Sequence, residues 1–169
     1  MMLNRNNRKE MTDIDNLVEA ERPRLVRYAC YRLGDWADAE DAVQDVFLQL
    51  HGKIRDADGC VVDNLRGYLY RSLANLCTDR LRQMQQRHFV RLEQACNEVD
   101  DKGKSWEEEF LLLSTLLAAI PEEQSEVIRL RLHGDYSFSD IADMLGVPLS
   151  TVKSRFQYGI EKIRKGIHQ

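Results

Sequence analysis

Apolar residues recur at spacings of three and four along almost the whole chain, which is the period of an amphipathic α-helix. No segment alternates apolar and polar residues in the way that is typical of a half-buried β-strand. The pattern therefore predicts an all-α fold. Seven helices are expected, at about Asp15–Leu33, Trp36–His51, Asn64–Gln86, Trp106–Ala119, Pro121–His133, Ser139–Leu145 and Ser150–Ile167.

The predicted helices form two groups that are separated by a segment of weak periodicity. Residues 88–105 combine acidic residues with Gly103 and favour a linker over a helix. Of the 169 residues, 43% are hydrophobic, which is enough for two small cores. We therefore expect two small helical domains, residues 12–87 and residues 106–169, joined by this linker.

The net charge of -4 conceals two basic segments. The segment Asn64–Arg91 contains six arginines and one aspartate, and the segment Pro148–Gln169 contains five basic residues and one glutamate. An acidic run from Glu93 to Glu109 lies between them. Two basic segments separated by acidic sequence predict two distinct contacts with nucleic acid.

The sequence offers little support for a membrane protein, a secreted protein or an enzyme. No run approaches the roughly 18 consecutive apolar residues of a membrane span, and the polar N-terminus lacks the apolar centre of a signal peptide. The cysteines are widely spaced, without a CxxC pair that would indicate zinc; they are Cys30, Cys60, Cys77 and Cys96. No nucleotide-binding GxxxxGK[ST] loop occurs. We expect a cytoplasmic, non-enzymatic protein without metal or cofactor.

The C-terminal segment contains the pattern of a helix-turn-helix. Ser137 and Asp140 form a capping-box pattern at the start of a short helix. Ala142 permits close helix approach, Gly146 tolerates the positive φ of a tight turn, and Val152 supplies a buried contact. Polar residues face outward near the start of the second helix, namely Thr151, Lys153, Ser154, Arg155 and Gln157. They can reach base edges in a DNA major groove; the alternative is a helical hairpin with a solvated basic face.

The N-terminal segment carries an acidic face beside a clean apolar stripe. Within the predicted helix Trp36–His51, the carboxylates of Asp38, Asp41 and Asp45 share one face and lie beside Gln44. A solvated surface and a docking face for a basic partner both fit this pattern. A paired-carboxylate active site is disfavoured, because no His or Lys is placed to complete it.

The predicted helix Asn64–Gln86 combines a core stripe with many arginines. Its polar and aromatic residues outside the stripe, with Arg87 just beyond its end, are Tyr70, Arg71, Asn75, Asp79, Arg80, Arg82, Gln83 and Arg87. Arginine with amide and aromatic groups suits a nucleic-acid strand whose bases are unpaired. Tyr68 is expected in the core, whereas the pattern leaves Tyr70 open between core and base contact.

At these positions the sequence resembles the extracytoplasmic-function (ECF) family of bacterial RNA polymerase sigma factors. The segment Asp38–Phe47 is similar to the core of the family's region two, and Tyr68–Arg82 is similar to its promoter-melting segment. Ile120–Gln124 and Ile141–Arg155 resemble region four. These segments follow the family's order over roughly Leu17–Ile167, and the large region-three domain is absent, as in this family.

The resemblance implies different roles for three groups of residues. The clamp helices of the polymerase largest subunit would be contacted by Asp41, Gln44 and Asp45. The promoter element close to the start site would lie near Asn75, Asp79, Arg80 and Arg82. The distal promoter element would be read as duplex DNA by Thr151, Lys153, Ser154 and Arg155. The loop 56–64 would hold a flipped base, but no base-reading residue is assigned in it.

The implied partners are core RNA polymerase, promoter DNA and an anti-sigma factor. A linker of about 20 residues reaches on the order of 60 Å when extended, so two domains could bind two promoter elements together. Two alternatives stay open from the residues alone. The chain could be a stand-alone helix-turn-helix regulator, or a helical interaction protein without a DNA role.

Overall fold

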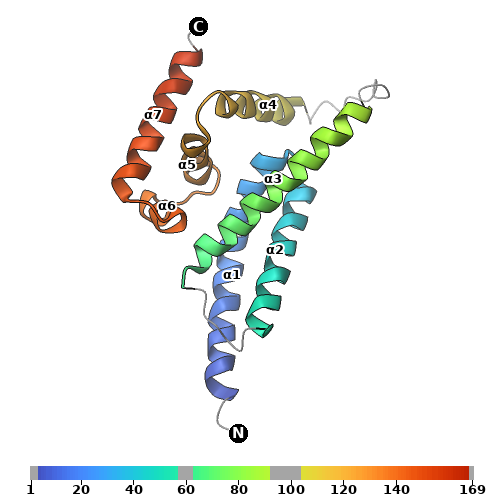
Figure 1. The fold of residues 1–169 in the computed structure, drawn as a ribbon, viewed down its shortest axis with the longest axis vertical. Coiled ribbons are helices and arrows are strands. Elements are labelled where there is room, and N and C mark those ends of the chain that lie inside the picture. Colours follow the sequence, from blue (N-terminus) through green and yellow to red (C-terminus); the bar gives the residue numbers. More distant parts are fainter. Residues whose placement is uncertain (1–3, 57–62, 92–103, 168–169) are drawn as a thin grey trace.

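The computed structural model describes residues 4–56, 63–91 and 104–167, and Figure 1 shows their arrangement. Every element in these ranges is an α-helix, which confirms the predicted all-α fold. The helices are α1 (Asn4–Leu33), α2 (Trp36–Asp56), α3 (Leu65–Arg91), α4 (Lys104–Ala118), α5 (Glu122–Leu132), α6 (Phe138–Leu145) and α7 (Leu149–Ile167).

The helix boundaries differ most from the prediction at the start of α1. The helix begins at Asn4 rather than Asp15. The extra residues are nearly all polar, so hydrophobic periodicity carries no sign of them. At the predicted linker, α3 continues to Arg91 and α4 begins at Lys104, which leaves 92–103 outside the described residues.

The first three helices form the N-terminal unit (α1–α3), in which α1 and α2 pack side by side and α3 packs on both (Figure 1). Gly34 permits the turn between α1 and α2, since its φ of +80° lies in the left-handed region. Asp35 then caps α2, because its carboxylate accepts a 2.8 Å hydrogen bond from the Asp38 N–H. The predicted apolar stripe of α2 is buried, at Ala39, Ala42, Val43, Val46, Phe47 and Leu50.

The last four helices form the C-terminal unit (α4–α7), which contains the predicted helix-turn-helix. The Asp140 N–H donates to the Ser137 hydroxyl at 3.1 Å, and the Ser137 N–H donates to the Asp140 carboxylate at 3.1 Å, which confirms the capping box. Gly146 ends α6 with a left-handed φ of +65°. Val152 of α7 is fully buried, so α6 and α7 are held in a fixed relation to each other.

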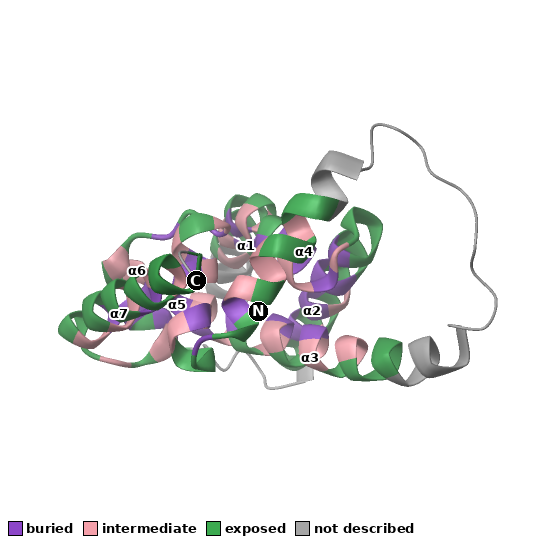
Figure 2. Cartoon of the chain, turned by 90° about the horizontal axis from the view of Figure 1, so that it is seen from above, coloured by how far each residue is buried: buried purple, intermediate pink, exposed green. Residues whose placement is uncertain are grey.

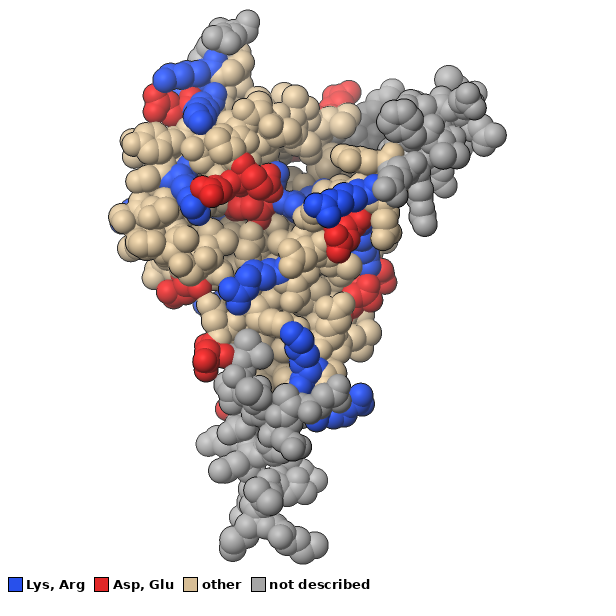
Figure 3. Space-filling model, in the orientation of Figure 1, with Lys and Arg blue, Asp and Glu red and all other residues tan. Residues whose placement is uncertain are grey.

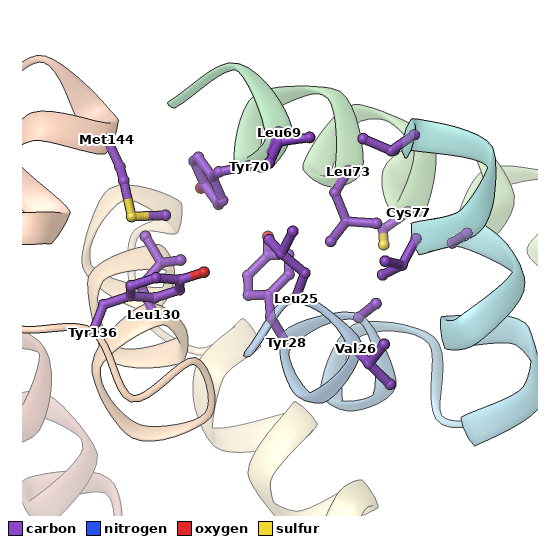
Figure 4. Packing of buried hydrophobic residues seen from close by; sticks show 14 of the residues in the cluster. Leu25, Val26, Tyr28, Leu69, Tyr70, Leu73, Cys77, Leu130, Tyr136 and Met144 are labelled. Carbon is purple, nitrogen blue, oxygen red and sulfur yellow. The ribbon is translucent and has the colours of Figure 1, made fainter. Parts of the chain in front are cut away.

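The two units share one continuous hydrophobic cluster, which the sequence pattern does not predict. Figure 4 shows side chains of α1 and α3 meeting side chains of the C-terminal unit. The labelled participants are Leu25, Val26, Tyr28, Leu69, Tyr70, Leu73, Cys77, Leu130, Tyr136 and Met144. In Figure 2 the buried positions lie on the facing sides of the helices. The structure therefore joins the two predicted domains through a common core.

Two of the four cysteines lie in this core. Cys30 and Cys77 are buried free thiols, and burial raises the pKa of each to about 11, so both stay protonated. Cys60 and Cys96 lie outside the described residues.

Among the helices described, none is long and apolar enough to cross a bilayer. Within the same ranges, no cluster of His, Cys, Asp and Glu is arranged to hold a metal ion.

His133 predicts a loss of stability in mild acid. Its ring stacks on Tyr31 of α1, with centroids 3.7 Å apart, and its Nδ1 is buried without a hydrogen-bond partner among the described residues. Burial, with a smaller effect of Arg129, lowers the pKa of His133 to about 4. The unfolded chain binds this proton below about pH 6.5 and the folded chain does not. Stability is therefore expected to fall by about 1–2 kcal/mol between pH 6.5 and 4, after allowance for solvent screening.

The measurement is the urea midpoint from circular dichroism at a series of pH values. His133→Phe keeps an aromatic ring against Tyr31 and removes the titrating group. It should flatten the pH dependence of the urea midpoint above pH 4.5. Below that pH, carboxyl groups also titrate and contribute. An unchanged slope in His133→Phe would assign the acid lability to a different group.

Candidate nucleic-acid interface

The start of α7 presents a polar surface to solvent. Lys153, Ser154 and Gln157 are exposed, while Thr151 and Arg155 are half-buried. The opposite face of α7 is fixed by Val152 and by Gly159, whose missing side chain lets α5 approach closely. The helix-turn-helix thus holds its outward residues on a rigid support, in the arrangement that reads a major groove.

Arg155 is already engaged in an ion pair within the C-terminal unit. Its Nη2 lies 3.0 Å from the Glu123 carboxylate of α5, and its side chain is 25% exposed. Glu123 is largely exposed, so the pair contributes little to stability and separates at low cost. Arg155 can therefore exchange Glu123 for another partner.

A second polar surface surrounds an open pocket between α2 and α3. The pocket has a volume of about 580 Å³ and is lined by Gln49, Gly52, Lys53, Tyr68, Ser72, Asn75, Leu76 and Asp79. This volume lies in the range of small-molecule sites and is ample for one nucleobase. The structure therefore brings Asn75 and Asp79 to one concave site, as their positions on one helix face suggest.

The sequence pattern does not predict the α2 side of this pocket. Lys53 lies over the ring of Tyr68, with Nζ 4.7 Å from the ring centroid, in a cation–π arrangement. Tyr68 is half-buried, so its ring contributes both to the core and to the pocket wall. Gln49 and Lys53 are one helical turn apart on α2, but the predicted helix ends at His51, so the sequence pattern does not pair them.

Arg80 lies on a different side of α3 from this pocket. Its guanidinium lies 2.8 Å from the Asp41 carboxylate and 2.7 Å from the Asp45 carboxylate, and it also donates to the Asp38 carbonyl. The structure thus places Arg80 within the acidic face of α2 rather than beside Asn75. Arg82 is exposed and forms only a loose 3.8 Å pair with Asp79.

The acidic face of α2 is accessible, as its helical spacing predicts. The Asp41 side chain is 69% exposed and the Asp45 side chain is 43% exposed. Gln44 is also exposed and accepts a long 3.4 Å hydrogen bond from Arg22 of α1. Arg80 partly neutralises Asp41 and Asp45 and holds the two carboxylates together on this face.

Charge is distributed in alternating small areas on the face shown in Figure 3. Acidic and basic side chains lie next to one another over the middle of the molecule, and Lys and Arg form no continuous basic surface on that face. This distribution agrees with the net charge of -4. On the face shown, basic side chains are therefore confined to small local areas.

Two family models match the chain, one on each unit. The Sigma-70 region 2 model matches residues 17–88, and the Sigma-70, region 4 model matches residues 116–165. The first range contains the pocket and the acidic face of α2. The second contains the helix-turn-helix.

Curated relatives and a solved structure are similar over most of the chain. ECF RNA polymerase sigma factor SigM of Mycobacterium tuberculosis is 32% identical over 142 residues, which are 83% of this chain and 70% of SigM. SigW of Bacillus subtilis is 28% identical over 151 residues, 80% of this chain and 79% of SigW. The sigma factor RpoE of Bartonella quintana, solved in complex with the anti-sigma factor NepR, has a TM-score of 0.53 and 21% identity. That match covers 90% of this chain and 95% of RpoE, and it shows a shared fold.

Proposed function

The chain belongs to the ECF RNA polymerase sigma factors, which are non-enzymatic transcription initiation factors, and on that premise we propose a distinct role for each of its polar surfaces. The acidic face of α2 binds core RNA polymerase. The pocket between α2 and α3 holds bases of the opened promoter, and the start of α7 reads the distal element as duplex. The observation that carries this proposal is that the pocket lining and the acidic face of α2 share no residue.

Polymerase docking is assigned to Asp41, Gln44 and Asp45. Their side chains are accessible on one helix face, while the opposite face of α2 is held in the core. A basic surface on the polymerase would pair with these carboxylates and displace little of the N-terminal unit. Arg80 is better placed to position this face than to contact DNA.

Promoter opening is assigned to the pocket and its rim. Asn75 and Asp79 supply an amide and a carboxylate for base edges, and Lys53 with Tyr68 supplies a cation and an aromatic wall. Bases stacked in a duplex cannot enter such a pocket, whereas a base rotated out of the stack can. Arg82, which is exposed and paired with the pocket residue Asp79, would contact phosphate. Most of the loop 56–64 lies outside the described residues, so no base-reading residue is assigned there.

Duplex reading is assigned to Thr151, Lys153, Ser154 and Arg155. We expect Arg155→Ala to reduce affinity for the distal element by about 5- to 100-fold and to relax sequence preference, as loss of a bidentate guanine contact does. Lys153→Ala should instead weaken all sequences alike and lower the salt dependence of binding by about one ion. The measurement is holoenzyme binding to promoter fragments at several salt concentrations. Unaltered binding by both variants would contradict the assignment of α7.

Transcription with purified core polymerase tests the proposal as a whole. The chain should direct initiation from specific sites in a genomic fragment library, and core polymerase alone should not. A stand-alone helix-turn-helix regulator would bind duplex DNA without binding core polymerase. Failure to bind core polymerase, combined with specific duplex binding, would favour that alternative.

The remaining assignments follow from the same premise. We propose domain boundaries at residues 12–87 and 106–169 with the linker 88–105, and action in the cytoplasm with the polymerase. An anti-sigma factor is a further proposed partner, because the structurally similar RpoE was solved with one.

A further inference from the structure

Gly52 lies inside α2, where its residue type disfavours the helix. α2 continues beyond it to Asp56. In a helix interior, glycine lowers the equilibrium constant for folding by about twofold to fivefold relative to alanine, because it gives up more backbone freedom. The backbone conformation does not require glycine here, since the glycines with positive φ among the described residues are Gly34 and Gly146. Gly52 thus weakens α2 without a conformational reason.

Helix packing does not require Gly52 either. A Cβ at this position would have no atom within 4 Å. Gly159 of α7 gives the contrast, because a Cβ there would lie 2.7 Å from Ile128. The close approach of α5 and α7 therefore explains Gly159, whereas the space beside Gly52 is open.

The open space beside Gly52 belongs to the pocket between α2 and α3. Gly52 lines this pocket of about 580 Å³ together with Gln49 and Lys53 of the same helix. From α3, Asn75 and Asp79 contribute to the lining. Gln49 and Lys53 carry long side chains, so the gap in the α2 wall lies at Gly52. What glycine contributes at this position is room on the pocket side of the helix.

We propose that Gly52 is a binding residue of this pocket, because its missing side chain lets an unpaired base lie directly against the α2 backbone. The inference rests on the proposed function of the pocket. Carbon atoms in contact lie about 3.5–4.0 Å apart, so even one methyl group at position 52 would displace a base that rests there. Glycine commonly serves where a ligand approaches the backbone closely. Natural sequences break local stability rules mainly at functional sites, which agrees with a glycine that weakens its own helix.

One substitution is therefore expected to have opposite effects on stability and on function. Gly52→Ala adds a methyl group that meets no protein atom, and it should lower the unfolding equilibrium constant of the free chain about twofold to fivefold. The same methyl group narrows the base site and should slow promoter opening. Gly52→Leu fills more of the pocket and should slow opening by about 5- to 100-fold, the range expected for loss of one base contact. An ordinary surface glycine would gain stability without loss of opening.

Fluorescence of 2-aminopurine measures promoter opening directly. Holoenzyme is mixed with a duplex promoter that carries this base near the start site, and its emission rises when the base unstacks. A second template, already unpaired there by mismatches, should largely restore the transcription that Gly52→Leu loses. Gly166→Ala and Gly166→Leu are the matched controls and should leave opening unchanged. Gly166 is exposed on α7, a Cβ there would also have no atom within 4 Å, and it lies outside the pocket lining.

Binding of core polymerase and the urea midpoint of the free chain complete the test. Normal opening by both Gly52 variants would overturn the inference. A loss explained by weaker polymerase binding would also overturn it, because Gly52 would then belong to the docking surface. A lower urea midpoint for Gly52→Ala would contradict the open space beside α2 and have the same consequence. If Gly52→Leu does not keep its helix content by circular dichroism, Gly52→Ala still decides the question.

The double variant Lys53→Ala/Asn75→Ala in the same pocket separates this inference from the proposed function. If the double variant slows opening and the Gly52 variants do not, the pocket keeps its function and Gly52 has no part in it. If neither slows opening, the base-binding role of the pocket fails and the inference fails with it. Slowed opening in both, with intact polymerase binding, supports a base that lies against Gly52.

Discussion

Replacing Asp45 by lysine is expected to weaken binding to core RNA polymerase by about 100-fold or more. The substitution places a cation where an accessible carboxylate faces the proposed basic partner, and like charges brought together at an interface cost several kcal/mol. It also removes one of the two carboxylates that hold Arg80, whose guanidinium lies 2.7 Å from Asp45. Titration of labelled chain with core polymerase measures the affinity.

Glu40→Lys is the matched control, because Glu40 is an exposed carboxylate of the same helix outside the Arg80 cluster. It makes the same change in charge and should alter polymerase affinity by only a small factor. Equal weakening by both variants would indicate a general charge effect, and no weakening by Asp45→Lys would remove the docking assignment. Arg80→Ala should resemble a mild form of Asp45→Lys, since Arg80 orients the acidic face.

The double variant Lys53→Ala/Asn75→Ala is expected to reduce transcription from a duplex promoter by about 10- to 100-fold. Both side chains line the pocket, where stacking and polar contacts to an unpaired base contribute roughly 1–3 kcal/mol for each base. The loss should be largely recovered on a template that is already unpaired by mismatches near the start site. The variant would still bind such a template, because the cost of opening has been removed.

The comparison between templates separates promoter opening from simple attachment. Gln83→Ala changes an exposed residue of the same helix outside the pocket and should transcribe both templates normally. An equal loss on both templates would mean that Lys53 and Asn75 only anchor the complex. The melting role of the pocket would then have to be withdrawn.

Local pattern predicts the helices of this protein because each has its own signal. The capping box at Ser137, the left-handed Gly146 and the buried stripe of α2 are all encoded within a few neighbouring residues. The same reasoning fails at the start of α1, where a polar helix has no apolar stripe. It also leaves Tyr70 open, and the structure shows this residue buried against Glu126.

Contacts between distant segments account for what the sequence pattern does not predict. Tyr28 and Glu126 are 98 positions apart, and neither has a neighbour in sequence that indicates the other. The family resemblance implies one role for Arg80 and Asn75, which stand on the same helix, yet the partners of Arg80 come from α2. Lys53 lies beyond the predicted end of its helix at His51, whereas α2 continues to Asp56. Helix faces follow from sequence, but the partner of each face depends on tertiary packing.

The shared core also has a consequence for synthesis of the chain. Tyr70 belongs to the N-terminal unit, whereas Met144, which meets the same cluster, follows it by 74 residues. At translation rates of roughly 5–20 residues per second, a ribosome needs about 4–15 s to add this stretch. During that interval the nascent N-terminal unit exposes tyrosine and leucine side chains that α5 and α6 later cover. A chaperone or a cotranslationally bound partner would meet this surface before the chain is released.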